Sequence, residues 1–394
     1  MAKFILPALA LAGTALAQCD GPSFTISASE DASQLASCQT YDGDIIIASE
    51  VSGQVQLNGV SSITGDLRCT NASQLTALSA DRLSSIGGTF DLEELQILSS
   101  LRLPSISRVN RVRWIALPGL QSLNFGAGIN AANNVYISNT GLTDLRGIEL
   151  TAVGAMDINN NQYLRTINVN SLTNVTQALS FSANGMNLAI EFPNLEAAGN
   201  LTFRNVSSIS MPSLANVPGS IGFYSNPFES FAAPNLTATG NTIAFVDSPM
   251  LSNLSFPSLE LIGGGLLLAN NSELTQIAGS FPALSTINGD INFYGTFENV
   301  AFPSLTDVKG AATVYTSSTN GTICDLFNRA KTGQAIKGQV TCETGSTNTA
   351  NNGTGTRSGS GSSRSSGAAV ANLNFDPSAP LTGFAAFVAA LLFI

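Results

Sequence analysis

The sequence contains no histidine and few charged residues. The absence of histidine from all 394 residues excludes histidine general bases, Ser-His-Asp and Cys-His nucleophile systems, and histidine metal sites. Lys, Arg, Asp and Glu make up only 11% of the chain, against roughly 25% in ordinary soluble domains, so something other than charge must keep the surface soluble. The formal net charge of -10 speaks against a nucleic-acid partner, which requires a basic surface. The hydrophobic fraction of 44% is large enough to bury a sizeable core.

The N-terminal segment is typical of a secretory signal peptide. Residues 1–17 combine Lys3, an apolar run and the small-residue site Ala15-Leu16-Ala17, the pattern that directs cleavage. The mature chain is therefore predicted to begin at Gln18, and a buried N-terminal helix is the alternative.

The C-terminal segment is typical of a glycosylphosphatidylinositol (GPI) attachment signal. The apolar run from Leu381 to Ile394 is too short for a hydrocarbon core about 30 Å thick, and a spacer and small residues precede it. Attachment is predicted at Gly367, with Ser366 and Ala368 as near alternatives, and residues 368–394 as the propeptide. A C-terminal helix docked on the domain is the competing interpretation.

The segment before this signal is low in complexity. Residues 344–367 contain only small and polar side chains apart from two arginines, so they predict a flexible stalk whose Ser and Thr are plausible O-glycan carriers. The ectodomain is then residues 18–343.

N-glycosylation acceptors are frequent for a chain of this length. Many N-x-S/T sequences in a secreted protein indicate substantial glycosylation, which would supply the solubility that charge does not. The predicted sites are Asn71, Asn174, Asn200, Asn205, Asn235, Asn253, Asn270, Asn320 and Asn352.

Four of the five cysteines lie near the two ends of the ectodomain. Cys19 and Cys38 are close to the mature N-terminus, and Cys324 and Cys342 precede the stalk. In an oxidising compartment two local disulfides are the natural pairing. Cys69 is then a buried free thiol; the alternative is a Cys38–Cys69 bridge with Cys19 free.

A repeat of about 22 residues runs through the middle of the chain. Its template is a Pro-x-Leu turn, a small or Gly-rich step, an apolar-x-apolar pair and often Asn, as in FPSLELIGGGLLLANN from Phe256 and FPALSTINGDINFYG from Phe281. Taking the first apolar residue of each pair as the phase residue gives one regular series: Leu67, Phe90, Val112, Val135, Met156, Leu179, Leu201, Ile221, Ile243, Leu266, Ile291 and Ala312, with an earlier coil around Ile45 to Ile47.

Each repeat predicts one short strand with one face inward. Units this short cannot bury that face alone, so they must stack as coils with parallel strands about 4.8 Å apart. The predicted fold is an all-β, right-handed parallel β-solenoid with disulfide-capped ends. Phe181, Phe203, Phe223 and Phe245 should form an internal ladder. One continuous stack is favoured over two lobes divided near residues 183–191.

The fourth residue after the phase residue is often asparagine, as at Asn71, Asn139, Asn160, Asn205 and Asn270. An inward asparagine could cap the backbone of the turn. Some of these positions are also N-glycosylation acceptors, and a glycosylated side chain cannot be buried. An outward position is therefore favoured.

The chain as a whole resembles the fungal GPI-anchored cell-wall-organisation proteins. The resemblance rests on the signal peptide, the leucine-rich-repeat-like coils, the terminal cysteine pairs, the stalk and the C-terminal signal, and its repeats are similar to receptor L-domains. It implies a non-enzymatic glycoprotein on the outer face of the plasma membrane or in the wall, needed for wall integrity, with wall glycans or mannoproteins as partners and no cofactor or metal.

One position per coil lies between the paired inward residues and should face outward, and the charges among these positions gather in the first coils. The possible ligand face comprises Arg68, Asp91, Glu93, Arg111, Arg113 and Tyr136. An ion ladder on a solvated sheet, worth about 0–1 kcal/mol per pair, is the simpler interpretation. Trp114 holds an inward position and should be core.

Two further functions remain open. Polysaccharide hydrolases also use parallel β-helices, and Asp91 with Glu93 is spaced permissively for an inverting pair. An adhesin or receptor-like ectodomain would instead present an open aromatic and charged face.

Overall fold

The computed structural model describes residues 19–126, 128–167 and 169–345. The predicted signal peptide, the attachment site Gly367, the acceptor Asn352 and the propeptide 368–394 lie outside these residues. The described chain divides into two compact units. The first runs to residue 132 and includes 140–142 and 146–148; the second comprises 133–139, 143–145 and the residues from 149 onward. The alternative lobe boundary near 183–191 falls inside the second unit, and the predicted domain limits stay a prediction.

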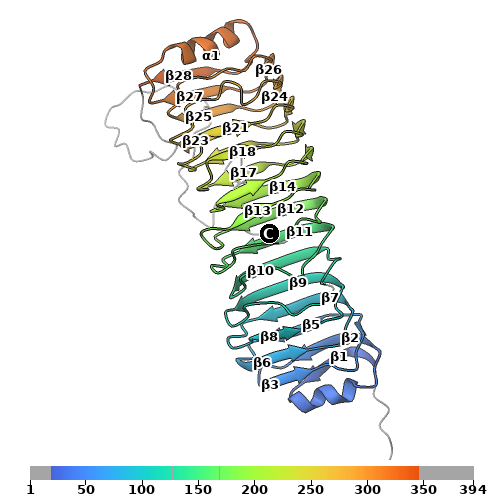
Figure 1. The fold of residues 1–394 in the computed structure, drawn as a ribbon. Helices are drawn as coiled ribbons and strands as arrows, with labels where there is room; N and C mark the ends of the chain where they lie inside the picture. The colour runs from blue at the N-terminus through green and yellow to red at the C-terminus, as the bar shows by residue number, and fades with distance from the viewer. Residues whose placement is uncertain (1–18, 127, 168, 346–394) are drawn as a thin grey trace, which may run out of the picture. The chain divides into compact units, whose positions relative to one another are not determined.

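The first unit is built almost entirely of strands that pair in parallel (Figure 1). One short 3-10 helix interrupts them. The elements are β1 (Asp20–Ile26), η1 (Ser29–Leu35), β2 (Thr40–Ile47), β3 (Ser52–Gln56), β4 (Ser62–Ile63), β5 (Leu67–Thr70), β6 (Gln74–Ser79), β7 (Ser85–Glu93), β8 (Ser100–Arg102) and β9 (Arg108–Leu117).

The second unit repeats the same pattern and ends with one α-helix. Its elements are β10 (Asn134–Thr140), β11 (Ala152–Asn159), β12 (Asn174–Ser182), β13 (Ala189–Glu191), β14 (Ala197–Arg204), β15 (Ser208–Ser210), β16 (Asn216–Val217), β17 (Ile221–Tyr224), β18 (Ser230–Ala232), β19 (Ala238–Thr239), β20 (Ile243–Val246), β21 (Asn253–Ser255), β22 (Leu261–Ile262), β23 (Leu266–Asn271), β24 (Thr286–Ile287), β25 (Ile291–Gly295), β26 (Asp307–Val308), β27 (Ala312–Thr316), α1 (Thr322–Thr332) and β28 (Val340–Thr344).

The predicted phase is confirmed residue by residue within each unit. In the first unit Ile45, Leu67, Phe90 and Val112 are successive register partners. In the second unit the same holds for Val135, Met156, Leu179, Leu201, Ile221, Ile243, Leu266, Ile291, Ala312 and finally Val340. The chain is therefore a parallel β-solenoid with about 22 residues per coil, as predicted.

The second apolar residue of each pair forms a parallel interior column. Phe181, Phe203, Phe223 and Phe245 are fully buried, and their rings stack at centroid distances of 6.1, 5.5 and 4.7 Å. The predicted ladder is confirmed. A buried Phe side chain contributes roughly 1.5–3 kcal/mol, so the column is a main source of cohesion between coils.

The ends of the described chain are closed by helices and disulfides. Cys19 pairs with Cys38 beside η1, and Cys324 of α1 pairs with Cys342 of β28, while Cys69 is a buried free thiol. These pairings confirm the favoured assignment. The helix α1, which the sequence analysis did not predict, buries Ile323 and Phe327. It covers the last coil, because an open end would expose apolar side chains.

Most coils place a non-glycine residue in the left-handed conformation at the end of the strand or directly after it, with φ between 51° and 58°. Asparagine tolerates this conformation better than most residues. The residues are Asn71, Glu94, Ala116, Asn139, Asn160, Ala183, Asn205, Ser225, Asp247 and Asn270. The asparagines among them are exposed or half-exposed, which confirms the outward position.

A second asparagine series faces inward one residue later and was missed. Asn161, Asn184, Asn226 and Asn271 are buried, with Ser248 between the last two. Each amide nitrogen donates to a carbonyl of the preceding coil, at 2.8 to 3.0 Å. Each side-chain oxygen of Asn184, Asn226 and Asn271 accepts an N–H of the preceding coil. The series satisfies turn backbone groups that would otherwise be buried without partners.

A polar side chain at the residue before the phase residue makes glycine necessary in the next coil. Asp66 Oδ1 accepts the N–H of Thr89 at 2.6 Å and occupies the place where a Cβ of Gly88 would lie. The same arrangement recurs with Asn200 and Gly219. The glycine step of the repeat therefore leaves room for the hydrogen bond between coils.

Candidate functional site

The charged residues of the first unit lie on three adjacent strands. Arg68 on β5, Asp91 on β7 and Arg113 on β9 are register partners. Their neighbours along each strand, which include Trp114, are fully buried or nearly so. Because side chains alternate along a strand, the three charged residues share the outer face, as predicted.

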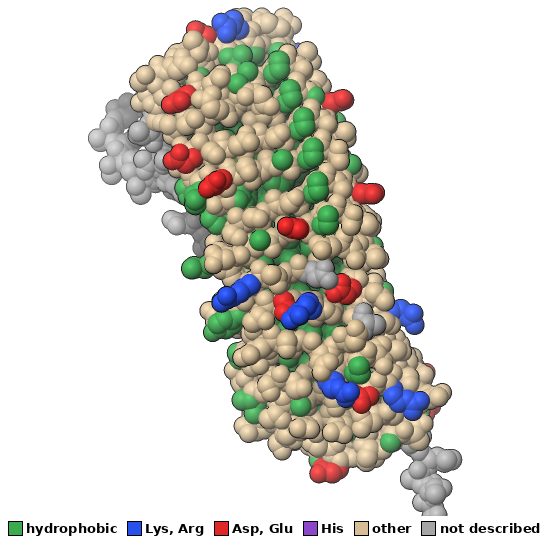
Figure 2. Space-filling view, in the orientation of Figure 1, with side chains coloured by type: hydrophobic (Ala, Val, Ile, Leu, Met, Phe, Trp, Pro, Cys, Tyr) green, Lys and Arg blue, Asp and Glu red, His purple; other side chains and the backbone are tan. Residues whose placement is uncertain are grey.

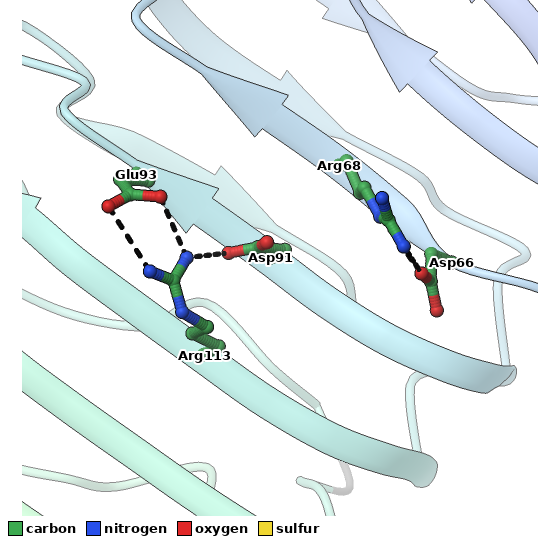
Figure 3. Close-up of polar contacts among 5 residues, drawn as sticks. All are labelled: Asp66, Arg68, Asp91, Glu93 and Arg113. Carbon is green, nitrogen blue, oxygen red and sulfur yellow. Dashed lines mark hydrogen bonds and ion pairs between the residues drawn. The ribbon is translucent and has the colours of Figure 1, made fainter. Parts of the chain in front are cut away.

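Arg113 holds both acidic residues of the candidate face. Its guanidinium donates to Asp91 Oδ1 at 2.7 Å and to the two carboxylate oxygens of Glu93 at 2.8 and 3.1 Å (Figure 3). The Arg113 side chain is 37% exposed, and those of Asp91 and Glu93 are 19% and 29% exposed. The bidentate geometry makes this the most ordered ion cluster of the face.

Arg68 makes a separate pair that the sequence analysis missed. It donates to Asp66, two residues earlier on the same face (Figure 3). Alternation along the strand already places residues 66 and 68 on the same side, so this pair could have been predicted from the sequence. Arg111 is exposed and makes no ion pair among the described residues; its charge acts on Asp66 from a distance.

These contacts lower the pKa of two of the carboxyl groups, Glu93 and Asp66. The hydrogen bond from Arg113 lowers the pKa of Glu93 and outweighs the opposing effect of partial burial. Burial raises the pKa of Asp66, but the Thr89 N–H and Arg68 outweigh it and hold that pKa below its ordinary value. A general acid requires the opposite, a pKa raised toward the working pH. The cluster therefore suits charge pairing and hydrogen bonding rather than proton transfer.

Tyr136 belongs to the second unit, where its surroundings differ. Its register partner is Asp157, a half-buried residue whose pKa is raised by burial, against hydrogen bonds from Asn159 and Ser180. Asn159 also accepts a hydrogen bond from Ser138 at 2.6 Å. The structure thus places Tyr136 beside the hydrogen-bonded network of Asp157, Asn159 and Ser180. The other predicted face residues lie in the first unit.

The predicted glycosylation acceptors within the described residues are accessible to different degrees. Asn71, Asn235, Asn253 and Asn320 are exposed, and Asn174, Asn200, Asn205 and Asn270 are half-exposed. Their modification stays a prediction. Their distribution is uneven, because Asn71 is the one acceptor sequence in the first unit.

Two kinds of structure are absent from the described residues: a metal-binding cluster and a membrane-spanning helix. They contain no group of three or more Cys, Asp or Glu side chains arranged to hold a metal ion. No helix in the described ranges has the length and apolar character needed to cross a membrane. Charged side chains are sparse on the face shown in Figure 2, where uncharged polar side chains and backbone predominate and hydrophobic side chains are scattered.

Comparison with known proteins identifies relatives along most of the chain. Residues 1–36 match the Ecm33 family, described as GPI-anchored cell wall organization protein. A cell surface GPI-anchored protein of Arthroderma benhamiae is 42% identical, covering 86% of this chain and 87% of its own. Protein ecm33 of Aspergillus fumigatus is 41% identical, covering 86% and 85%. The cell wall mannoprotein PST1 of Saccharomyces cerevisiae is 33% identical, covering 82% and 72%.

No solved structure matches the chain, so its assignment rests on these sequence relatives and on its repeat. Two relatives are more than 40% identical over alignments that each cover 86% of the chain. The chain therefore belongs to the fungal family of GPI-anchored cell wall organisation proteins.

Proposed function

We propose that this protein is a non-catalytic, GPI-anchored glycoprotein that organises the fungal cell wall by presenting its solenoid as a scaffold at the cell surface. The names of its relatives place those proteins at the cell surface or in the wall. The predicted anchor at Gly367 would tether the chain to the outer leaflet of the plasma membrane. Wall glycans or mannoproteins are the proposed partners.

The proposal that the protein is not a hydrolase rests on the contacts that Asp91 and Glu93 make with Arg113. Asp91 and Glu93 form the one pair singled out as permissive for glycoside hydrolysis, and both accept hydrogen bonds from Arg113. A hydrolase keeps one of its two carboxyl groups protonated until it donates to the leaving group. Arg113 stabilises the ionised form instead, so this pair is better suited to fixing the surface than to cleaving a bond.

A partner-binding role of the charged face is the second candidate. The first unit has one acceptor sequence, Asn71, whereas the second has several, so predicted glycans cover less of the first unit. The side chain of Arg68 is about half exposed, and Arg111 is exposed. Both retain donors that a glycan or a mannoprotein could use.

The test is rescue of a strain that lacks the protein. The full chain should restore resistance to wall stress, and a chain without residues 368–394 should be secreted without restoring it. Rescue by that secreted chain would contradict the tethered scaffold. The purified protein should release no sugar from glucan or chitin; release that is abolished by Asp91→Asn or Glu93→Gln would establish the hydrolase instead.

The charged face is tested in the same strain by Arg68→Ala combined with Arg113→Ala. Arg102→Ala is the matched control, because Arg102 lies on β8, which belongs to a different sheet of the same unit. It pairs there with Asp81 and not with the charged face. If the face binds a partner, only the double variant should fail to restore the wall while still reaching the surface. Equal rescue by both variants would show that the charged residues of this face act only as a structural ion ladder and do not bind a partner.

A further inference from the structure

Two tyrosines form a stacked pair near the end of the second unit. Tyr294 on β25 and Tyr315 on β27 are register partners, and their ring centroids lie 5.7 Å apart at an interplanar angle of 18°. Both side chains are half-exposed. Phe293 and Val314, the preceding residues on each strand, are fully buried. The rings therefore stand on a rigid, well-anchored part of the sheet.

Polar side chains without partners border the rings. Asn292, Thr313 and Thr341 are register partners in the adjacent outward row, and each is half-exposed. Within the described part of the chain, none of these side chains, and neither tyrosine hydroxyl, makes a hydrogen bond. The charged face and the network around Asp157 differ in this respect, because their polar groups satisfy one another. The donors and acceptors around the tyrosines remain available to a ligand.

The register partner of Tyr294 in the preceding coil is the small residue Ala269, which is itself buried. The neighbouring acceptor Asn270 directs its amide nitrogen to Asp247, in the coil before, at 2.9 Å. A glycan attached to the amide nitrogen of Asn270 would therefore begin on the side of Asp247, away from Tyr294.

The chemistry of this surface indicates an uncharged ligand with both apolar and hydroxyl-bearing sides. The strands β23, β25, β27 and β28 contain no Lys or Arg, and Glu343 is their one charged residue. Aromatic rings attract the slightly positive C–H groups of a saturated ring, and β-linked glucose presents such groups on both faces because its substituents are equatorial. Its hydroxyls would lie along the rim, where Asn292 and Thr313 offer amide and hydroxyl groups.

We propose that Tyr294 and Tyr315, with Asn292, Thr313 and Thr341, form a binding site for a β-linked glucose chain. Tyr294 and Tyr315 supply the stacking surface, and the three polar residues bind ring hydroxyls. This site is separate from the charged face of the first unit. This proposal depends on the proposed function in one respect: it assumes that the protein is located where it can contact wall polysaccharide.

The test measures binding of a soluble β-1,3-linked glucose oligosaccharide to the full-length protein, purified in detergent and freed of N-glycans, by titration calorimetry. The unsubstituted protein should bind. Tyr294→Ala and Tyr315→Ala should each weaken binding about tenfold, which corresponds to about 1.4 kcal/mol. Tyr294→Phe should keep most of the affinity, because it retains the ring. Tyr163→Ala is the matched control, since that tyrosine is 53% exposed elsewhere in the unit, and should bind as the parent does.

The site would be refuted if the unsubstituted protein did not bind, or if Tyr294→Ala, Tyr315→Ala and Tyr163→Ala bound equally well. Binding of an α-linked mannose oligosaccharide at the same or higher affinity would overturn the assigned ligand class. The denaturation midpoint of each alanine variant should fall only slightly, because each ring is half-exposed and its removal costs one stacking contact. Binding is therefore compared at a temperature where every variant is folded. Wall rescue is scored separately, so loss of glucose binding with full rescue leaves the scaffold proposal standing, and failed rescue by a chain that binds normally does not affect the site.

Discussion

The inward asparagine series makes a strong prediction about stability. Asn226 is fully buried; its amide nitrogen donates to the carbonyl of Phe203 at 3.0 Å, and its side-chain oxygen accepts the N–H of Val206 at 2.8 Å. Asn226→Ala would leave the Val206 N–H buried without an acceptor. It would also remove one of the hydrogen bonds to the Phe203 carbonyl, which keeps its bond to β17 in the parallel ladder. An unsatisfied buried group costs about 1–3 kcal/mol and a lost hydrogen bond about 1 kcal/mol, so the free energy of unfolding of the second unit should fall by about 3 kcal/mol.

The measurement combines guanidinium chloride denaturation with native-state hydrogen exchange. The midpoint should fall, and the Val206 amide should lose its protection, because its acceptor is gone. Asn216→Ala is the control: Asn216 is exposed on β16, and its side chain makes no hydrogen bond within the described ranges. That change should stay within about 0.5 kcal/mol. A loss below about 1 kcal/mol for Asn226→Ala, with Val206 still protected, would refute the account of the inward series.

Three other perturbations test separate parts of the structure. Burial raises the pKa of Cys69 to about 12, so a thiol reagent at neutral pH should label only unfolded protein, and fast labelling of the native state would contradict the buried position. The pKa of Glu93 is lower in the folded protein than in the unfolded chain. The stability that this difference contributes is present above the unfolded pKa of about 4.3 and is lost as pH falls through the folded pKa. Arg113→Ala should therefore flatten this part of the curve of denaturation midpoint against pH. Gly88→Ala would force a Cβ into the aspartate oxygen of the preceding coil and should cost about 1–3 kcal/mol in denaturation, whereas Gly321→Ala, with open space around it, should cost little.

The repeat could be predicted because stacking imposes one rule on every coil. Leu67, Phe90 and Val112 must align for their side chains to share an interior, so a constant spacing in the sequence becomes a register in space. The same rule predicted the outward row, including Arg68, Asp91 and Arg113. Its success depends on a period held over many coils, which averages out irregular spacing in any one of them.

The inward asparagines escaped prediction because the chain often carries asparagine at two consecutive positions. At Asn160–Asn161 and at Asn270–Asn271, the first residue turns outward in the left-handed conformation and the second points in. A shift of one residue reverses the face of a side chain, and the sequence pattern does not resolve which residue makes the turn. The choice between Asp66 and Asp91 as the partner of Arg68 is likewise decided by side-chain geometry rather than spacing.

The helix α1 escaped for a different reason. A repeat period describes coils that have a neighbour on each side, whereas the last described coil has a neighbour on one side alone. The chain departs from its repeat there: the step from Ala312 to Val340 contains the helix, and Cys342 takes the place of an interior apolar residue so that it can bond to Cys324. Irregular spacing at the end of a regular series is therefore itself a signal of a cap.

The division between inward and outward positions also explains how one fold can carry two different surfaces. Inward residues are constrained by stacking, so Phe203 cannot change without disturbing its neighbours on both sides. Outward residues contact fewer partners, and each coil can vary them almost independently. In the first unit the outward positions carry Arg113, Asp91 and Glu93, which form hydrogen bonds with one another. In the second unit it is used for Tyr294 and Tyr315, whose polar groups remain unsatisfied and which therefore favour a ligand from outside the chain.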